Sequence, residues 1–273
     1  MREWIIFVSS NKRLLNFGFL FNFFSSFGQT FFISLFVPFW IDALKISNAF
    51  FGTLYAGVTL ISAVLLSLSG KYIDKISLKR YGQIVFSGLF IAIIILSQAN
   101  NIFVMMLGLL LIRWFGQGLM THTSSTGIAK NFDMNRGKAL GFTALGHPAG
   151  QFVLPLIVLP LINICDWRMS LVYLSIAAFI LIFPTLWAIT PVTNFEPDIV
   201  RKESTMAEKN DNYFYSMKFW IITINSFLLP FLCTAVFLYQ YTIGQSKGWD
   251  SSWVAFSFAF YAVFNALSLV LSG

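Results

Sequence analysis

Charged residues are scarce in this sequence. Asp, Glu, Lys and Arg together make up 11% of the 273 residues, whereas roughly 25% is usual in soluble proteins. Apolar residues make up 57%, and the mean hydropathy is +0.75. So much apolar surface cannot be hidden in the core of a water-soluble protein, so lipid must solvate most of it. The composition excludes a soluble globular domain and predicts a membrane protein.

Cysteine and histidine are also rare, with two of each. Neither Cys165 nor Cys233 belongs to a CxxC pair or a Cys/His cluster, so we expect no disulfide framework, no metal site and no cofactor. No glycine-rich phosphate-binding loop is present, which argues against an ATP-driven pump. None of the 11 acidic residues lies within an apolar span. Because an intramembrane catalytic triad or di-metal cluster needs such acids, we expect that the protein is not an enzyme.

Long apolar runs are what the sequence has instead. Eight of them are long enough to cross about 30 Å of hydrocarbon as helices. Their continuous apolar character favours helices over barrel strands, which alternate at every second residue. The sequence predicts an all-α polytopic membrane protein with eight transmembrane helices, at residues 14–40, 51–69, 82–97, 102–126, 139–162, 169–189, 219–241 and 253–272.

The basic residues lie in short clusters between these spans. The N-terminus and the segments after the second, fourth and sixth spans hold 14 Lys and Arg residues, and those on the other side hold three. This asymmetry places both termini in the cytoplasm and is typical of a multi-pass protein of a plasma membrane, most simply a bacterial inner membrane. The net charge of +7 does not indicate nucleic-acid binding, because no basic stripe alternates with stacking aromatics.

The longest hydrophilic stretch divides the chain unequally. Shifting the second part back by 203 residues lays the seventh span on the first and pairs Asn225 with Asn22. The equal spacing is a better repeat signal than the few identities. We therefore expect a truncated or partial chain that stops two helices into a second copy of its first half. The predicted parts are a six-helix bundle at 1–190, a cytoplasmic linker at 191–218 and an incomplete second half at 219–273.

Polar stripes at helical spacing mark the spans that are expected to face a central cavity. The first, second, fourth and fifth spans carry such stripes, as do the two spans of the second part, whereas the third and sixth carry almost no polar residues in their middles. The candidate cavity-lining or substrate-binding residues are Asn22, Gln29, Tyr55, Arg113, Gln117, His147, Gln151, Asn225, Tyr261 and Asn265.

Arg113 is the only charged residue inside a predicted span. Placing arginine at mid-membrane costs about 3 kcal/mol or more on insertion scales. A guanidinium in a wet cavity suits a carboxylate or a phosphate. The alternative is a structural arginine held by backbone carbonyls and Gln117.

His147 lies beside Pro148 in the middle of the fifth span. Its imidazole can exchange a proton near neutral pH, which makes it a candidate for coupling transport to a proton gradient. Equally, Pro148 frees the carbonyl of Ala144 and bends the helix, so His147 could simply satisfy the kinked backbone. His122, near the cytoplasmic end of the fourth span, is expected to cap or pack.

Several short motifs occur in order between these spans. The segment GKYIDKISLKR after the second span resembles the loop signature of the major facilitator superfamily, with departures at Ser77 and Leu78. Arg113 followed by Gln117-Gly118, and Trp167-Arg168 before the sixth span, fit the same family. The RWFGQG and ALGHPAG segments most resemble its monocarboxylate and oxalate/formate carrier branch. The residues that match the loop signature are Gly70, Asp74, Lys75, Lys79 and Arg80.

The resemblance implies a secondary transporter of 12 helices in two six-helix halves that rock around a midplane site. Its partners would be a small organic solute, an organic anion being the first candidate, the lipid bilayer and a coupling ion. The loop signature would act as a conformational switch, although its charges alone also fit a solvated cytoplasmic turn. Two other readings stay open, an inert truncated remnant and a membrane protein that binds partners without transport. Nothing in the sequence indicates the oligomeric state.

Overall fold

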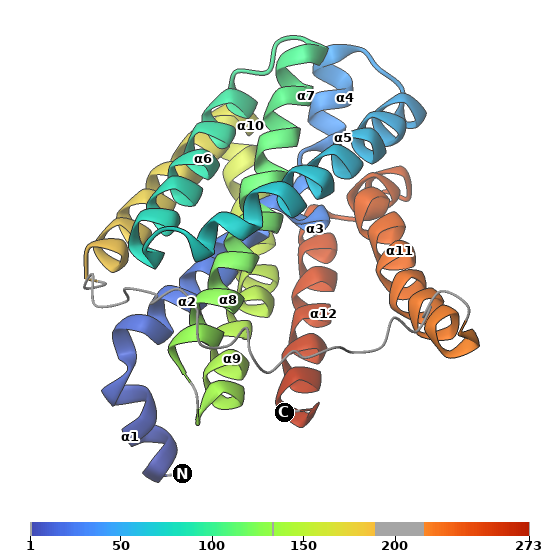
Figure 1. The fold of residues 1–273 in the computed structure, drawn as a ribbon. Helices are drawn as coiled ribbons and strands as arrows, with labels where there is room; N and C mark the ends of the chain where they lie inside the picture. The colour runs from blue at the N-terminus through green and yellow to red at the C-terminus, as the bar shows by residue number, and fades with distance from the viewer. Residues whose placement is uncertain (1, 133, 189–215, 273) are drawn as a thin grey trace.

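The computed structural model describes residues 2–132, 134–188 and 216–272, and every regular element in these ranges is a helix (Figure 1). Six helices in the described part are long and apolar enough to cross a membrane. They run over Asn48–Asp74, Leu78–Ser97, Ile102–Asn131, Arg136–Ala188, Met217–Ser246 and Ser252–Leu271. The predicted all-α membrane class is thereby confirmed, and the predicted count of eight is not.

The first predicted span is interrupted, so the expectation of one unbroken helix over 14–40 is wrong. Gln29 has an extended backbone (φ −81°, ψ 151°), and Pro38 lies in the first turn of the last piece, where its missing N–H is tolerated. Short pieces result, none of which meets the length of a span. They are α1 (Arg2–Ser10), α2 (Lys12–Ser25), η1 (Ser26–Gly28), α3 (Thr30–Ser34) and α4 (Val37–Leu44).

The next three helices begin at polar side chains that cap the first turn. The hydroxyl of Ser47 accepts from the backbone N–H of Phe50 at 3.1 Å, and Ser77 and Asn101 cap the two following helices in the same way. Such caps satisfy amide groups that a helix start leaves without partners. The helices are α5 (Asn48–Ser69), α6 (Leu78–Ser97) and α7 (Ile102–Leu111), and a short helix, η2 (Gly70–Asp74), follows α5 directly.

The fourth predicted span changes its winding in the middle. α7 continues without a break into the π-helical segment η3 (Ile112–Met120) and then into α8 (Thr121–Asn131). π-Helical turns are uncommon and are frequently found at functional sites. Arg113 and Gln117 both lie in this segment.

The fifth and sixth predicted spans form one long run in the structure. α9 (Arg136–Ala144) ends just before Pro148, and α10 (Gly146–Ala188) contains a sharp change of direction at Asp166, whose φ is 69° and ψ 157°. The bend at Asp166 lies between the ranges predicted for the two spans. The C-terminal part consists of α11 (Met217–Ser246) and α12 (Ser251–Ser272).

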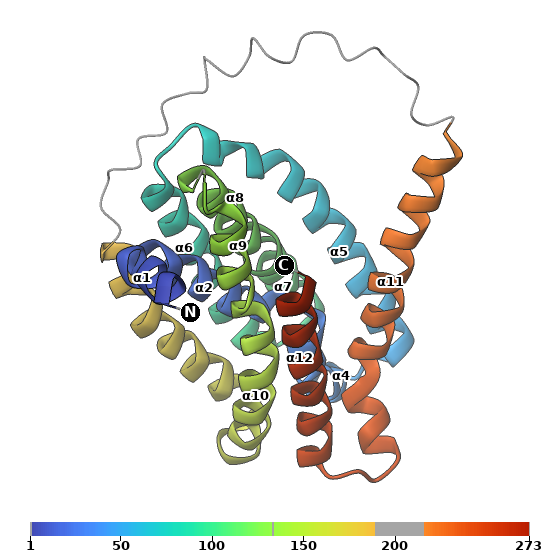
Figure 2. The same cartoon turned by 90° about the horizontal axis from the view of Figure 1, so that it is seen from below.

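The helices pack into one bundle in which those with polar stripes contact one another. α2 contacts α8 and α10, α5 contacts η3, and α6 lies against α7 and α10. α12 packs along α10, while α11 contacts α3 and α4 and turns most of its surface outward (Figure 2). Phenylalanine dominates the core of the first part, where Phe17, Phe21, Phe27, Phe31 and Phe32 are fully buried.

Both chain ends lie at the same end of the bundle, where α1 begins and α12 ends (Figure 1). The linker predicted at 191–218 and the boundary at residue 190 fall almost entirely outside the described residues. The division into 1–190, 191–218 and 219–273 therefore stays a prediction.

Candidate functional site

Arg113 lies at the centre of a small polar cluster in the interior of the bundle. Its Nη1 donates to the hydroxyl of Tyr55 at 2.6 Å and to the carbonyl oxygen of Gly28 at 3.3 Å, and lies 3.5 Å from Oγ1 of Thr30. Tyr55 and Thr30 also hydrogen-bond each other, at 2.9 Å. The guanidinium lies over the Tyr55 ring, 4.9 Å from its centroid. Three chain segments, α5, η3 and the break in the first span, thus meet at one cation.

The partners of Arg113 are all neutral. Only 6% of the residue is exposed, and no carboxylate within the described residues forms an ion pair with it. Its Nε is buried and has no hydrogen-bond partner in the same part of the chain. Burying a cation without an opposite charge is unfavourable, and an entering anion would remove that cost.

The cluster is held together by a very close helix crossing. The Cα of Gly28 faces the backbone of η3 so closely that a Cβ built at Gly28 would lie 2.2 Å from the amide nitrogen of Gln117 and 2.4 Å from the carbonyl oxygen of Ile112. Gly116 on the opposite side approaches the backbone of Gly28 in the same way. Only a pair of glycines allows the two backbones to come so close, as small residues do between membrane helices.

Asn22 joins three segments instead of pointing into open space. Its side-chain amide donates to Oγ of Ser124 at 2.9 Å and to the carbonyl of Thr143 at 2.8 Å. Ser124 donates onward to the carbonyl of Gly18 at 2.8 Å. In this conformation the residue bridges α2, α8 and α9.

Gln151 connects the first part of the chain to the second. It is buried on α10, and its Oε1 accepts a hydrogen bond from Nδ2 of Asn265 on α12 at 3.0 Å. Tyr261, one turn earlier on α12, is 41% exposed and packs edge-on against Phe237 of α11. Asn225 is exposed and donates to the carbonyl of Ile221 in its own helix at 2.9 Å, so the structure does not bring it to the Arg113 cluster.

Gln117 and Gln29 flank the cluster and are half-buried. Gln117 follows Arg113 by one turn of η3, and Gln29 is the extended residue between Gly28 and Thr30. The backbone at both positions takes part in the close crossing or the helix break.

His147 lies on the α10 side of the interior, next to α3. Its ring centroid is 6.3 Å from that of Phe31, and its Nδ1 is buried without a hydrogen-bond partner among the described residues. The helix does break between Ala144 and Gly146. No hydrogen bond between the imidazole and the carbonyl of Ala144 is present in the described structure, and both roles considered for His147 stay predictions.

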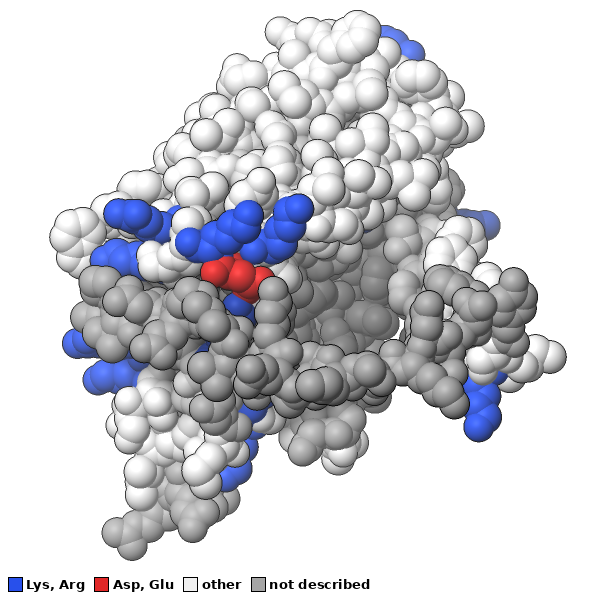
Figure 3. All heavy atoms as spheres, viewed as in Figure 1, with Lys and Arg blue, Asp and Glu red and all other residues white. Residues whose placement is uncertain are grey.

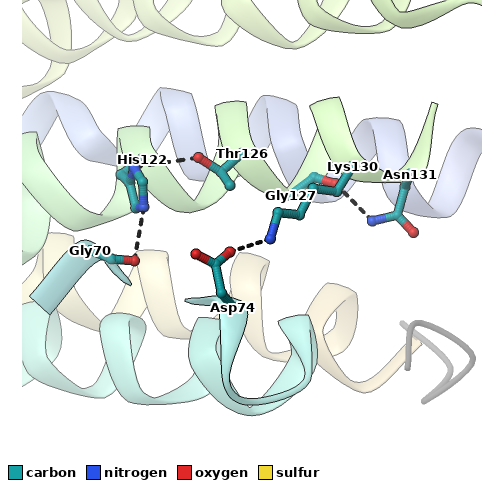
Figure 4. A network of polar contacts seen from close by, with 7 residues as sticks. All are labelled: Gly70, Asp74, His122, Thr126, Gly127, Lys130 and Asn131. Carbon is teal, nitrogen blue, oxygen red and sulfur yellow. Dashed lines mark hydrogen bonds and ion pairs between the residues drawn. The ribbon is translucent and has the colours of Figure 1, made fainter. Parts of the chain in front are cut away.

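The loop after α5 is attached to α8 along one helix face (Figure 4). Nε2 of His122 lies 3.0 Å from the carbonyl oxygen of Gly70, and Asp74 forms an ion pair with Lys130. Nδ1 of His122 contacts Oγ1 of Thr126 at 3.4 Å. Because these α8 positions are spaced by four, they share one face of the helix. The expected capping role fits the contact that His122 makes with a carbonyl at the end of α5.

The basic residues of the loop signature have separate contacts. Nζ of Lys75 lies 5.0 Å from the centroid of the Tyr72 ring. Nζ of Lys79 donates to the carbonyl oxygen of Trp187 at 3.4 Å and lies 5.5 Å from the centroid of its ring. Arg80 is exposed in the first turn of α6.

Two partners in these networks were missed from the sequence. Thr30 lies eight residues after Asn22, on the face that a straight helix would share with Asn22 and Gln29, so helical spacing was a usable signal that was not followed to this residue. Lys130 was missed because it resembled the other positive charges expected on the cytoplasmic side. It lies eight residues after His122 and so on the same helix face, which was a usable signal.

Comparison with protein families matches residues 18–273 to the Major Facilitator Superfamily. The match covers nearly the whole chain, and the chain therefore belongs to this superfamily of membrane transporters. Comparison with curated proteins found none that matches it. The family-level resemblance in the sequence is thereby confirmed, whereas the branch of monocarboxylate and oxalate/formate carriers stays a prediction.

Proposed function

We propose that the protein is a secondary transporter that moves a small organic anion by alternating access, with Arg113 as the anion-binding group. Membership in the superfamily supports transport in general. The observation that carries the choice of an anion is the buried guanidinium whose described partners, Tyr55, Thr30 and the carbonyl of Gly28, are all neutral. A carboxylate would supply the missing charge and accept from donors that the protein leaves unused.

The cluster also explains how the cation is tolerated when no solute is bound. Neutral oxygens from α5 and from the break in the first span contact Nη1 of the guanidinium, while Nε remains without a partner among the described residues. We propose that an entering carboxylate takes over part of these contacts. The remaining candidate residues, Gln117, Gln29, Gln151 and Asn265, would then contact the rest of the solute.

Uptake by proteoliposomes that contain the protein tests this proposal, with a panel of small carboxylates compared with uncharged sugars and with organic cations. We expect carboxylate uptake that is lost in Arg113→Ala, while membrane insertion stays normal. Arg136→Ala is a matched control, because Arg136 is an exposed arginine at the start of α9. Carboxylate uptake with unchanged kinetics in Arg113→Ala would refute the role of Arg113.

We further propose His147 as the group that couples transport to protons. The support is its buried Nδ1 without a described partner and its location on α10, the helix that also carries Gln151. Replacing His147 with Gln keeps a polar side chain of similar size but removes the titrating group. Uptake by His147→Gln should then no longer respond to an imposed pH gradient, and an unchanged response would reject this role.

The remaining features of the proposal concern topology. Counting the interrupted first segment as one span and the bent run Arg136–Ala188 as two gives the eight spans expected from the sequence. The distribution of Lys and Arg supports cytoplasmic termini in a plasma membrane. The contacts of Gly70 and Asp74 with α8 support a role for this loop in holding one conformation of the cytoplasmic side.

A further inference from the structure

A groove lies on the outer surface of the bundle, between α6 and the last turns of α10. It has a volume of about 390 Å³, within the range of roughly 300–1,000 Å³ that is common for ligand sites. Its α10 wall is built from Phe179, Phe183, Leu186 and Trp187, and its α6 wall from Gln83, Phe86, Ser87, Phe90 and Ile91. None of these residues belongs to the Arg113 cluster.

The aromatic rings of the groove form a continuous apolar surface. The ring of Phe179 lies 6.1 Å from that of Phe86, 5.8 Å from that of Phe90 and 5.2 Å from that of Phe183. Phe183 in turn lies 6.3 Å from Trp187. In a helix that faces lipid, such a surface is suited to hydrocarbon chains.

The α6 wall carries two polar side chains, Gln83 and Ser87, among its apolar ones, and plain contact with hydrocarbon does not explain them. Lys79, Gln83 and Ser87 follow one another at intervals of four on α6 and therefore share one face. Gln83 and Ser87 are exposed, and neither side chain has a hydrogen-bond partner among the described residues. Polar groups that face a bilayer need partners, and the glycerol and ester groups of a phospholipid can provide them.

A cation is fixed at the mouth of the groove. Nζ of Lys79 is held by the carbonyl oxygen and the ring of Trp187, and one hydrogen bond leaves two of its three N–H donors for another partner. Arg80 follows in the same turn. Figure 3 shows Lys and Arg side chains gathered on the part of this face where α6 begins and α10 ends. This end of the bundle is the expected cytoplasmic end, where anionic lipids are concentrated and basic pockets between helices bind their headgroups.

We propose that this groove is a binding site for an anionic phospholipid. An acyl chain lies along the aromatic wall, the glycerol region meets Gln83 and Ser87, and the phosphate is bound by Lys79 with Arg80 beside it. The charge of the mouth selects an anionic headgroup over a zwitterionic one. The groove lies outside the Arg113 cluster, so this proposal does not depend on which solute is transported.

Native mass spectrometry of the full chain tests the proposal. The protein is purified in mild detergent and incubated with equal amounts of dioleoyl phosphatidylglycerol and dioleoyl phosphatidylcholine. We expect preferential retention of phosphatidylglycerol. Lys79→Ala should weaken its binding about fivefold, which is the effect of removing one basic residue near a membrane surface.

A steric variant with a matched control addresses the groove itself. Ser87→Trp fills the space between the walls and should abolish the preference. Ser67→Trp makes the same change at an exposed position of α5, away from the groove, and should retain it. Equal retention of both lipids by the unaltered chain would overturn the proposal whatever the variants do, and so would full retention of phosphatidylglycerol by Ser87→Trp.

Discussion

The close crossing of Gly28 with η3 gives the sharpest test of the structure. Replacing Gly28 with Ala would add a Cβ at 2.2 Å from the amide nitrogen of Gln117 and 2.4 Å from the carbonyl oxygen of Ile112. Side-chain carbons essentially never come within 3.0 Å of another heavy atom. Both obstacles are backbone atoms, which cannot move aside as the tip of a flexible side chain can. The segment around Gly28 and η3 must therefore move apart by about 0.8 Å to accept the added Cβ.

Two effects add up in Gly28→Ala. Overpacking of a tight interior costs about 1–3 kcal/mol. The carbonyl of Gly28 accepts a hydrogen bond from Arg113 at 3.3 Å, and losing a bond to a charged group costs about 1.5–3 kcal/mol. We therefore expect Gly28→Ala to lower the free energy of unfolding by about 2.5–6 kcal/mol.

The same substitution at Gly57 is the control. A Cβ at Gly57 would meet nothing within 4 Å, and the residue lies in the interior of α5. Alanine is favoured over glycine inside a helix by about 1 kcal/mol, so Gly57→Ala should be neutral or slightly stabilising. Thermal unfolding in detergent, followed by tryptophan fluorescence, compares the two variants directly. Equal unfolding midpoints for Gly28→Ala and Gly57→Ala would refute the close crossing.

Three further substitutions test other contacts, each by the same thermal measurement. Asn22→Ala removes two hydrogen bonds between helices. In a membrane such a bond contributes about 0.6 kcal/mol on average and about 1.7 kcal/mol at most, so the unfolding midpoint should fall. An unchanged midpoint would contradict the role of Asn22 as a bridge between helices. Asp166 has a positive φ, which costs a residue other than glycine about 1–3 kcal/mol. Asp166→Gly should therefore raise the unfolding midpoint, whereas Asp166→Ala should not. Equal midpoints for these two variants would argue against backbone strain at this position. Asp74→Asn removes an ion pair whose aspartate side chain is 56% exposed, so the loss should be under about 1 kcal/mol, and a larger one would show that the pair is more than a surface contact.

The sequence was sufficient for the fold class and for the members of the site that follow helical spacing. Arg113 stood out because it is a charge in an apolar run, and Tyr55 because it begins the polar stripe of its span. The structure places these two in direct contact, at 2.6 Å. A single charged residue in an apolar run and a polar residue at helical spacing are both local features, so they can be recognised from the sequence alone.

The break in the first span could not be placed from the sequence in the same way. Small residues around Gly28 weaken the helix there, but whether the chain breaks depends on what it meets elsewhere. Here it meets Gly116 in η3, nearly ninety residues later. At the break, the carbonyl of Gly28 and the hydroxyl of Thr30 both contact Arg113. Contacts that are distant in sequence therefore decide where the first span breaks and which backbone carbonyl faces Arg113.

The break at Gln29 and the π-helical winding of η3 occur at the same crossing, and this coincidence has a physical consequence. Each irregularity alters the regular helix hydrogen bonds, and the carbonyl of Gly28, released at the break, is the one that accepts from Arg113. The guanidinium is therefore held by backbone that is already irregular. A solute carboxylate that competes for Arg113 would release the Gly28 carbonyl and loosen the crossing of the first and fourth spans. Solute binding and helix movement would then be coupled through one residue, since a ligand shifts a conformational equilibrium only through contacts that differ between the two states.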